Sequence, residues 1–460
     1  MLRRKIETVL MNWKENRKQA LLVTGARQIG KSYSIERFID SNFEYSIKIN
    51  FSDRADLIDS FAKINKTESL ILLLSLVGGN NLIPGKTVVF FDEIQLVYSR
   101  RKKLIERGLL ENTSLDIISA MKPLSAKGEY KFILSGSLLG VEINDVLLNP
   151  TGYMDSVQMF PLDFEEFLWA KGVGQDVISY VESCYLKEEK VMDAVNDMLL
   201  EYFREYVLVG GMPESVEEYI SKKNLYSLQL SQEQIVKFYH KDITTYIDDA
   251  DKKLRVRDIY DAIPSELNGK NKRFVSTHVV EGGYIKRNSL EDEFLWLTNA
   301  AVAIPVYNVT EATIPLSLAS ERKTLKLFLS DTGLLTSMLV SSDIRQKLLT
   351  NEKEINYGAP YENAAATELN AHGFAQKLYY YNSKKHGEVD FIIEYEGEVL
   401  PIEIKSGKPD FMSVYNHTAL NNIISKYDIR KAYIFGNCNV KRETNVILQL
   451  PIYMISFVRR

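Results

Sequence analysis

The chain of 460 residues contains very little cysteine and no long apolar run. Its two cysteines, Cys184 and Cys438, lie far apart and form no C-x-x-C pair, which excludes a zinc ribbon or a disulfide framework and fits a reducing cytoplasm. The most apolar segment, residues 70–77, is too short for a transmembrane helix, which needs about 20 residues. The basic first residues precede no apolar stretch, so no signal peptide is predicted. We therefore expect a cytoplasmic protein without a membrane passage.

An excess of positive charge is also lacking, because the formal net charge is -4. This excludes a protein coated with basic residues but leaves room for a local nucleic-acid track. Basic clusters occur at residues 100–103, 252–257 and 270–273, but most clusters of this kind are ordinary solvated surface and are weak evidence for nucleic-acid binding. The length exceeds what one hydrophobic core usually organises, so about three domains are expected.

A phosphate-binding motif lies near the N-terminus. Residues 25–32 read GARQIGKS and match G-x-x-x-x-G-K-[S/T] at every constrained position. An apolar strand is expected before the motif and a helix after it, which is the context that such a loop requires; the alternative is an ordinary glycine-rich turn. Lys31 would reach the β- and γ-phosphates, and Ser32 would help to hold Mg²⁺. The residues predicted to bind ATP are Gly25, Ala26, Arg27, Gln28, Ile29, Gly30, Lys31, Ser32 and, from a later strand, Ser137.

A second strand supplies the carboxylates that hydrolysis needs. The apolar residues 87–91 are followed by Asp92, which would coordinate Mg²⁺, and by Glu93, which would polarise the attacking water. A strand over residues 131–135 ends in Ser135 and Ser137, where a polar sensor or a simple turn is expected. With strands also predicted at residues 21–24 and 45–50, the pattern indicates the parallel sheet of a P-loop NTPase.

The sequence pattern becomes helical in the middle of the chain. Residues 166–250 are predicted to be helical, with a break at Gly210-Gly211-Met212-Pro213, and are interpreted as a helical lid. Residues 251–349 follow the order helix, helix, then strands, which is the outline of a winged helix-turn-helix domain. Its recognition region and wing would lie at residues 276–301 and would either bind DNA or serve packing alone.

The order of these motifs resembles the bacterial and archaeal ATPases that have an AAA-type N-terminal domain and a C-terminal domain of unknown function. The resemblance covers almost the whole chain and rests on the phosphate loop, FDEIQ at 91–95, SGS at 135–137, FPLDFEEF at 160–167, GGMP at 210–213 and SDTGLL at 330–335. Before the Pro-Leu segment the family commonly has Gly-Arg, whereas this chain has Gly152-Tyr153. An arginine finger from a neighbouring copy in a homo-oligomer is expected. Arg27, Arg204 and Arg287 are candidates, but surface salt bridges explain each of them more simply and the finger is left unassigned.

A second group of charged residues lies near the C-terminus. In the strand predicted at residues 399–405, Glu403 and Lys405 face one way while the isoleucines between them enter the core. Asp390 can converge on them from the preceding strand, and Glu362 from a predicted helix. The five histidines form no metal-ligand spacing.

This pattern resembles the restriction-endonuclease-like PD-(D/E)xK fold over residues 355–460. The resemblance implies that Glu362, Asp390 and Glu403 hold Mg²⁺ or Mn²⁺, and that Lys405 orients water or stabilises developing negative charge. The alternatives are a solvated strand face with mixed charges, and a nuclease-like domain retained for binding alone.

Together the sequence predicts an α/β multidomain protein: a P-loop ATPase core (1–165), a helical lid (166–250), a winged-helix-like domain (251–349) and a restriction-endonuclease-like domain (350–460). The expected function is an ATP-hydrolysing enzyme coupled to a nuclease-like domain that acts on nucleic acid, DNA rather than RNA. One alternative is an ATP-dependent switch with an inactive docking domain. Another is a sequence-specific DNA binder that acts through the winged helix.

Overall fold

A computed structural model describes residues 2–111, 116–137, 154–247, 249–269, 290–349, 358–407 and 417–460. The chain divides into two compact units. The N-terminal unit is Arg3–Phe160 with Asn299–Ala301, and the C-terminal unit is Pro161–Thr298 and Val302–Arg460 with Met1–Leu2. Each unit has its own sheet.

The N-terminal unit is built on a five-stranded parallel sheet with the order β2-β3-β4-β1-β5. Its strands are β1 (Ala20–Gly25), β2 (Tyr45–Asn50), β3 (Thr87–Asp92), β4 (Lys131–Ser137) and β5 (Met154–Gln158). The predicted strands β1 to β4 are confirmed to within two residues, whereas β5 was not expected. β1 and β3 are buried along their whole length, as parallel strands covered on both faces should be.

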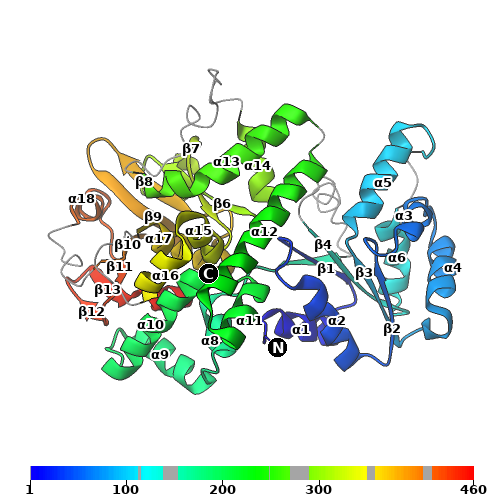
Figure 1. Ribbon diagram of the computed structural model, residues 1–460, viewed down its shortest axis with the longest axis horizontal. Coiled ribbons are helices and arrows are strands. Elements are labelled where there is room, and N and C mark those ends of the chain that lie inside the picture. Colours follow the sequence, from blue (N-terminus) through cyan, green and yellow to red (C-terminus); the bar gives the residue numbers. More distant parts are fainter. Residues whose placement is uncertain are drawn as a thin grey trace. The chain divides into compact units, whose positions relative to one another are not determined.

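Helices cover both faces of this sheet. They are α1 (Ile6–Asn16), α2 (Lys31–Asn42), α3 (Ala55–Ala62), α4 (Thr67–Gly78), α5 (Gln95–Glu106) and α6 (Ile117–Ala126). Figure 1 shows α1 and α2 on one side of the strands and α3, α4 and α6 on the other. On the second side Phe51 and Phe61 pack on Phe91 of β3, with ring centroids 5.9 and 5.6 Å from it. This core fixes the end of β3, where the predicted carboxylates lie.

The C-terminal unit begins with helices, which confirms the helical prediction for this part of the chain. They are α8 (Phe164–Ala170), α9 (Gln175–Lys187), α10 (Asp193–Val209), α11 (Pro213–Lys222), α12 (Leu225–Tyr246), α13 (Ala250–Asn268) and α14 (Glu291–Asn299). Among the described residues, no helix is both long and apolar enough to cross a bilayer.

The segment expected to form a winged helix contributes strands to a larger sheet. β6 (Ala303–Val309) and β7 (Ser320–Leu329) pair with each other, and β6 also pairs with β8 (Tyr379–Ser383). The predicted recognition region and wing fall mostly on residues 270–289, outside the described residues, as do the basic cluster at 270–273 and Arg287. α15 (Thr332–Leu339) and α16 (Ser342–Leu349) follow β7.

The large sheet has eight strands in the order β12-β13-β11-β10-β9-β8-β6-β7. Its later elements are α17 (Gly358–Leu369), β9 (Gly387–Tyr395), β10 (Glu398–Lys405), α18 (Thr418–Tyr427), β11 (Ala432–Gly436), β12 (Lys441–Arg442) and β13 (Ile447–Pro451). β8, β9 and β10 are antiparallel neighbours, and β10 pairs in parallel with β11. α17 packs against β10, and α18 packs against β9. The predicted helix around Glu362 and the three strands that follow it are thereby confirmed.

Candidate nucleotide-binding site

The loop between β1 and α2 has the backbone geometry of a phosphate cradle. Gly25 and Gly30 adopt φ values of 145° and 84°, which residues with a Cβ rarely adopt. A Cβ at Gly25 would also overlap the carbonyl oxygen of Met159. α2 begins at Lys31, directly after Gly30, so its first N–H groups lie next to the loop. The sequence therefore places a helix N-terminus, the kind of position that favours anions, directly after the loop.

Lys31 is buried inside this loop. Its Nζ donates hydrogen bonds to the carbonyl oxygens of Gly25 (3.1 Å) and Ala26 (2.6 Å). Burial lowers the pKa of Lys31 to about 8, although nearby Glu93 and Asp92 favour the charged form. The ammonium group is thus held by weak neutral acceptors, which phosphate oxygens can replace.

Asp92 is held in place by groups from the neighbouring strands. It is the last residue of β3 and is 2% exposed. Asn50, the last residue of β2, donates from Nδ2 to Asp92 Oδ2 at 3.1 Å, and the Glu93 N–H donates to Oδ1 at 3.0 Å. The hydroxyl of Ser135 on β4 also donates to Oδ1. Three parallel strands therefore orient one carboxylate at their carboxyl ends.

Glu93 lies beside Asp92 and has a constrained backbone, with φ of 55°. Gln95 Nε2 donates a hydrogen bond to its Oε2 atom, and one guanidinium nitrogen of Arg27 lies 3.9 Å from that same atom. The Glu93 side chain is 17% exposed, so solvent can reach it. A carboxylate in this position can accept a hydrogen bond from a water beside the loop.

Sequence reasoning missed three residues of this site. Asn50 and Gln95 orient Asp92 and Glu93, and Arg4 supports the loop by donating to the carbonyl oxygens of Ile29 (2.8 Å) and Phe160 (2.7 Å). Asn50 could have been found, because it ends the strand next to β3. Nothing in the sequence around Arg4 pointed to the loop.

The predicted sensor serine lies on β4. Ser137 pairs with Gly25 through its place in the strand register, and its side chain lies outside the described part of the structure. Ser135 is the serine that contacts a carboxylate of the site. The prediction that named both residues therefore has support for Ser135, and Ser137 stays a prediction.

The charged residues predicted near the C-terminus lie on adjacent elements. Asp390 on β9 accepts a hydrogen bond from the Ile404 N–H of β10 at 2.9 Å, and Lys405 Nζ lies 2.6 Å from Glu403 Oε1. Glu362 is 3% exposed on α17, the helix that packs against β10. His417, which formed no sequence motif, lies with its Nδ1 atom 3.9 Å from Glu403 Oε1.

These residues do not form the expected metal site. Within the described ranges, no group of three or more His, Cys, Asp or Glu side chains is arranged to hold a metal ion. One oxygen of Glu403 is paired with Lys405, and one oxygen of Asp390 accepts the Ile404 N–H of β10. The predicted binding of Mg²⁺ or Mn²⁺ by Glu362, Asp390 and Glu403 therefore has no support from the structure.

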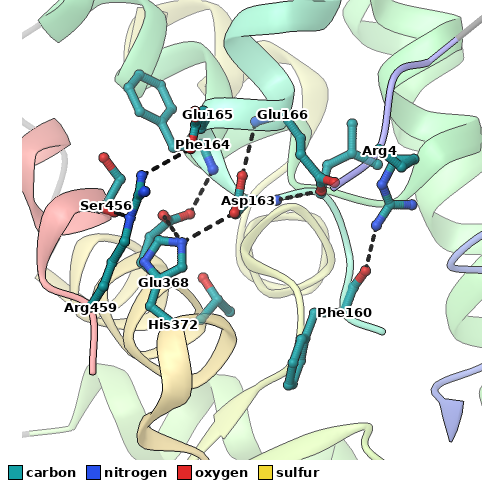
Figure 2. A network of polar contacts seen from close by, with 12 residues as sticks. Arg4, Phe160, Asp163, Phe164, Glu165, Glu166, Glu368, His372, Ser456 and Arg459 are labelled. Atoms are coloured by element: carbon teal, nitrogen blue, oxygen red, sulfur yellow. Dashed lines mark hydrogen bonds and ion pairs between the residues drawn. The ribbon is translucent and has the colours of Figure 1, made fainter. Parts of the chain in front are cut away.

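Three motifs without catalytic groups come together in the C-terminal unit. Asp331 accepts hydrogen bonds from the N–H groups of Gly211 (2.6 Å) and Leu334 (2.9 Å), so it caps α15 and fixes the glycines before α11. Figure 2 shows Asp163 receiving the Glu166 N–H at 2.9 Å, with its other oxygen 3.1 Å from His372 Nε2. The GGMP, SDTGLL and FPLDFEEF segments thus have a structural role: their hydrogen bonds hold the starts of helices and neighbouring segments in place, and we call such contacts structural joints.

Family models identify the N-terminal unit. An AAA domain model matches residues 17–168. The chain carries an AAA-type P-loop ATPase domain. The AAA domain covers all five parallel strands, and two models of domains of unknown function, DUF8612 and DUF4143, match residues 200–345 and 357–454. Neither description names a winged helix or a nuclease.

The solved structures that match this chain are distant from it. The Walker-type ATPase of Pyrococcus abyssi is 16% identical with a TM-score of 0.42, and the match covers 74% of this chain and 96% of that chain. The RuvB Holliday junction branch migration motor of Thermotoga maritima is 12% identical with a TM-score of 0.26, covering 66% and 89%. A structure described for katanin self-assembly is 11% identical with a TM-score of 0.23, covering 37% and 55%. No curated protein matches the chain.

Proposed function

We propose that this protein binds Mg²⁺-ATP at Gly25–Ser32 and hydrolyses it. The observation that carries the proposal is that Lys31, Asp92 and Glu93 gather at the carboxyl edge of one parallel sheet, beside a glycine-rich helix N-terminus. The residues present suit the cofactor, because the Ser32 hydroxyl and the Asp92 carboxylate are oxygen ligands that Mg²⁺ prefers. Bound Mg²⁺ would neutralise charge on the phosphates.

Each residue then has a distinct task. Lys31 exchanges its contacts with the loop carbonyls for phosphate oxygens. Asn50 and Ser135 keep Asp92 in one orientation, so that the carboxylate need not reorganise when the metal binds. Glu93 accepts a hydrogen bond from the water that attacks the γ-phosphate.

Nucleotide binding and ATPase assays on matched variants test this proposal. Lys31→Ala should weaken ATP binding by more than about tenfold and abolish hydrolysis, because it removes the buried charge of the loop. Glu93→Gln should bind ATP at least as tightly as the unaltered protein and hydrolyse it about 100-fold more slowly. Lys102→Ala, which alters an exposed lysine of α5, is the control. Hydrolysis that survives in Lys31→Ala would contradict the assignment.

We further propose that ATP turnover controls the C-terminal unit, which binds nucleic acid and resembles a nuclease. The order α17, β8, β9, β10, α18, β11 and the proximity of Glu403, Lys405 and Asp390 support a nuclease-like domain. The Glu403–Lys405 ion pair equally favours the alternative, an inactive domain used for docking. A homo-oligomer that supplies an arginine finger is part of the same proposal, with the arginine unassigned.

Cleavage assays distinguish the two roles of the C-terminal unit. Purified protein is incubated with single- and double-stranded DNA and RNA, with Mg²⁺ or Mn²⁺, and with or without ATP. If the domain cuts, Asp390→Asn and Lys405→Ala should lose cleavage, whereas the exposed control Lys384→Ala should retain it. Absence of metal-dependent cleavage by the unaltered protein would favour the docking role.

A further inference from the structure

The Oε2 atom of Glu93 is contacted by two side chains that differ in how freely they can move. Gln95 donates to Oε2 from the first turn of α5 and is 1% exposed, so its position is fixed by packing. Arg27 approaches the same oxygen from the phosphate loop, and its side chain is 30% exposed. The first contact is rigid, whereas the second can be broken by rotation of an arginine side chain.

Arg27 also lies where nucleotide phosphates would compete for it. It is the second residue after Gly25 in the loop whose N–H groups would surround the phosphates. A guanidinium group binds phosphate through paired, charge-assisted hydrogen bonds, which are stronger than an ion pair at 3.9 Å. Arg27 cannot hold Glu93 and a phosphate in the same geometry, so nucleotide binding favours its release from the carboxylate.

We propose that Arg27 is a positioning residue that restrains Glu93 until a nucleoside triphosphate draws its guanidinium group away, while Gln95 keeps the released carboxylate aimed at the water. The inference rests on the ATP hydrolysis proposed above and adds a regulatory step to it. Nucleotide binding at the loop thereby frees Glu93 to act as the base, and Arg27, a residue of the loop, links the two events.

A double-mutant cycle on nucleotide affinity tests the Arg27 step. The Kd of AMP-PNP with Mg²⁺ is measured for the unaltered protein, Arg27→Ala, Glu93→Gln and the double variant. Glu93→Gln should tighten binding about two- to fivefold more when Arg27 is present, because Arg27 then has no carboxylate to leave. Glu93→Gln also reduces the repulsion between residue 93 and the phosphates. This effect is the same with Arg27 and with Arg27→Ala, so it cancels in the cycle. An equal effect of Glu93→Gln in both backgrounds would overturn the proposal.

Gln95 is tested by separating kcat from affinity. Gln95→Met keeps a side chain of similar length without the donor, so AMP-PNP affinity should be unchanged while kcat falls about tenfold. A variant that keeps kcat would refute the positioning role, and normal AMP-PNP binding shows that the variant is folded. Arg107→Ala, an exposed arginine of the same unit, is the control for Arg27.

The outcomes separate this inference from the proposed function. If the unaltered protein neither binds AMP-PNP nor hydrolyses ATP, the ATPase proposal fails. If it does both in a Lys31-dependent manner but the cycle shows no coupling, only the Arg27 step fails.

Discussion

The buried ammonium group of Lys31 should make nucleotide affinity depend on pH. Burial lowers the pKa of Lys31 to about 8, and only the charged form can pair with phosphate. As pH rises through this value, the free protein loses the proton that binding must then restore. With a pKa near 8 in the free protein, the Kd for ATP should increase about twofold by pH 8 and about tenfold by pH 9, relative to pH 7.

Titration with a fluorescent ATP analogue at pH 7, 8 and 9, at constant ionic strength, measures this effect. Lys31→Arg is the matched control, because its guanidinium group remains charged throughout this range. Its affinity is expected to be lower overall but to change by less than about twofold with pH. A flat profile for the unaltered protein, or parallel slopes for the two proteins, would refute the reasoning from burial.

Three further predictions concern the supports of the two units. Burial raises the pKa of Asp331 from 3.8 to about 6, so its contribution to stability is greatest at low pH and is lost as pH rises through 6. Between pH 4 and 7 the unfolding free energy of Asp331→Asn, measured in urea, should therefore gain about 2.4 kcal/mol relative to the unaltered protein, and a constant difference would contradict this. Gly211→Ala should lower the unfolding free energy by at least about 2 kcal/mol, because the new Cβ overlaps backbone atoms of Leu162. The control is Gly174→Ala, whose Cβ meets only a flexible aspartate side chain and which should cost less than about 1 kcal/mol. Ser135→Ala removes a hydrogen bond to Asp92, so steady-state assays should show kcat about tenfold lower with ATP affinity within about twofold, and an unchanged kcat would exclude a role for this contact.

The strands and the loop around Gly25–Ser32 could be predicted because their signals are local. β1 and β3 are continuous apolar runs that end directly at the loop and at Asp92, and the carboxyl ends of parallel strands share one edge. β5 could not be predicted in the same way. Its sequence, MDSVQ, is only partly buried and has no apolar run, and it joins the sheet through pairing with β1.

Long-range strand pairing in the middle of the chain could not be predicted from the sequence pattern. β6 and β7 form an antiparallel hairpin after the segment predicted as recognition region and wing, and β6 also pairs with β8, so that Tyr307 lies opposite Tyr379. A hairpin pattern does not reveal which further strand lies beside it, because both edges of a strand have the same hydrogen-bonding groups. The local elements were therefore predicted better than the sheet to which they belong.

Three of the six motifs that support the family resemblance contain none of the residues proposed for chemistry. Asp331 is buried and uses its carboxylate to bind N–H groups at the starts of two helices, and the glycine at 210 has φ of 72° with no room for a Cβ beside that carboxylate. Such joints tolerate few alternatives, since a lost acceptor leaves buried donors unsatisfied. A joint of this kind gives a sequence a recognisable pattern without indicating a substrate. The function proposed for the C-terminal unit is therefore best tested at Asp390, Glu403 and Lys405, charged residues of β9 and β10.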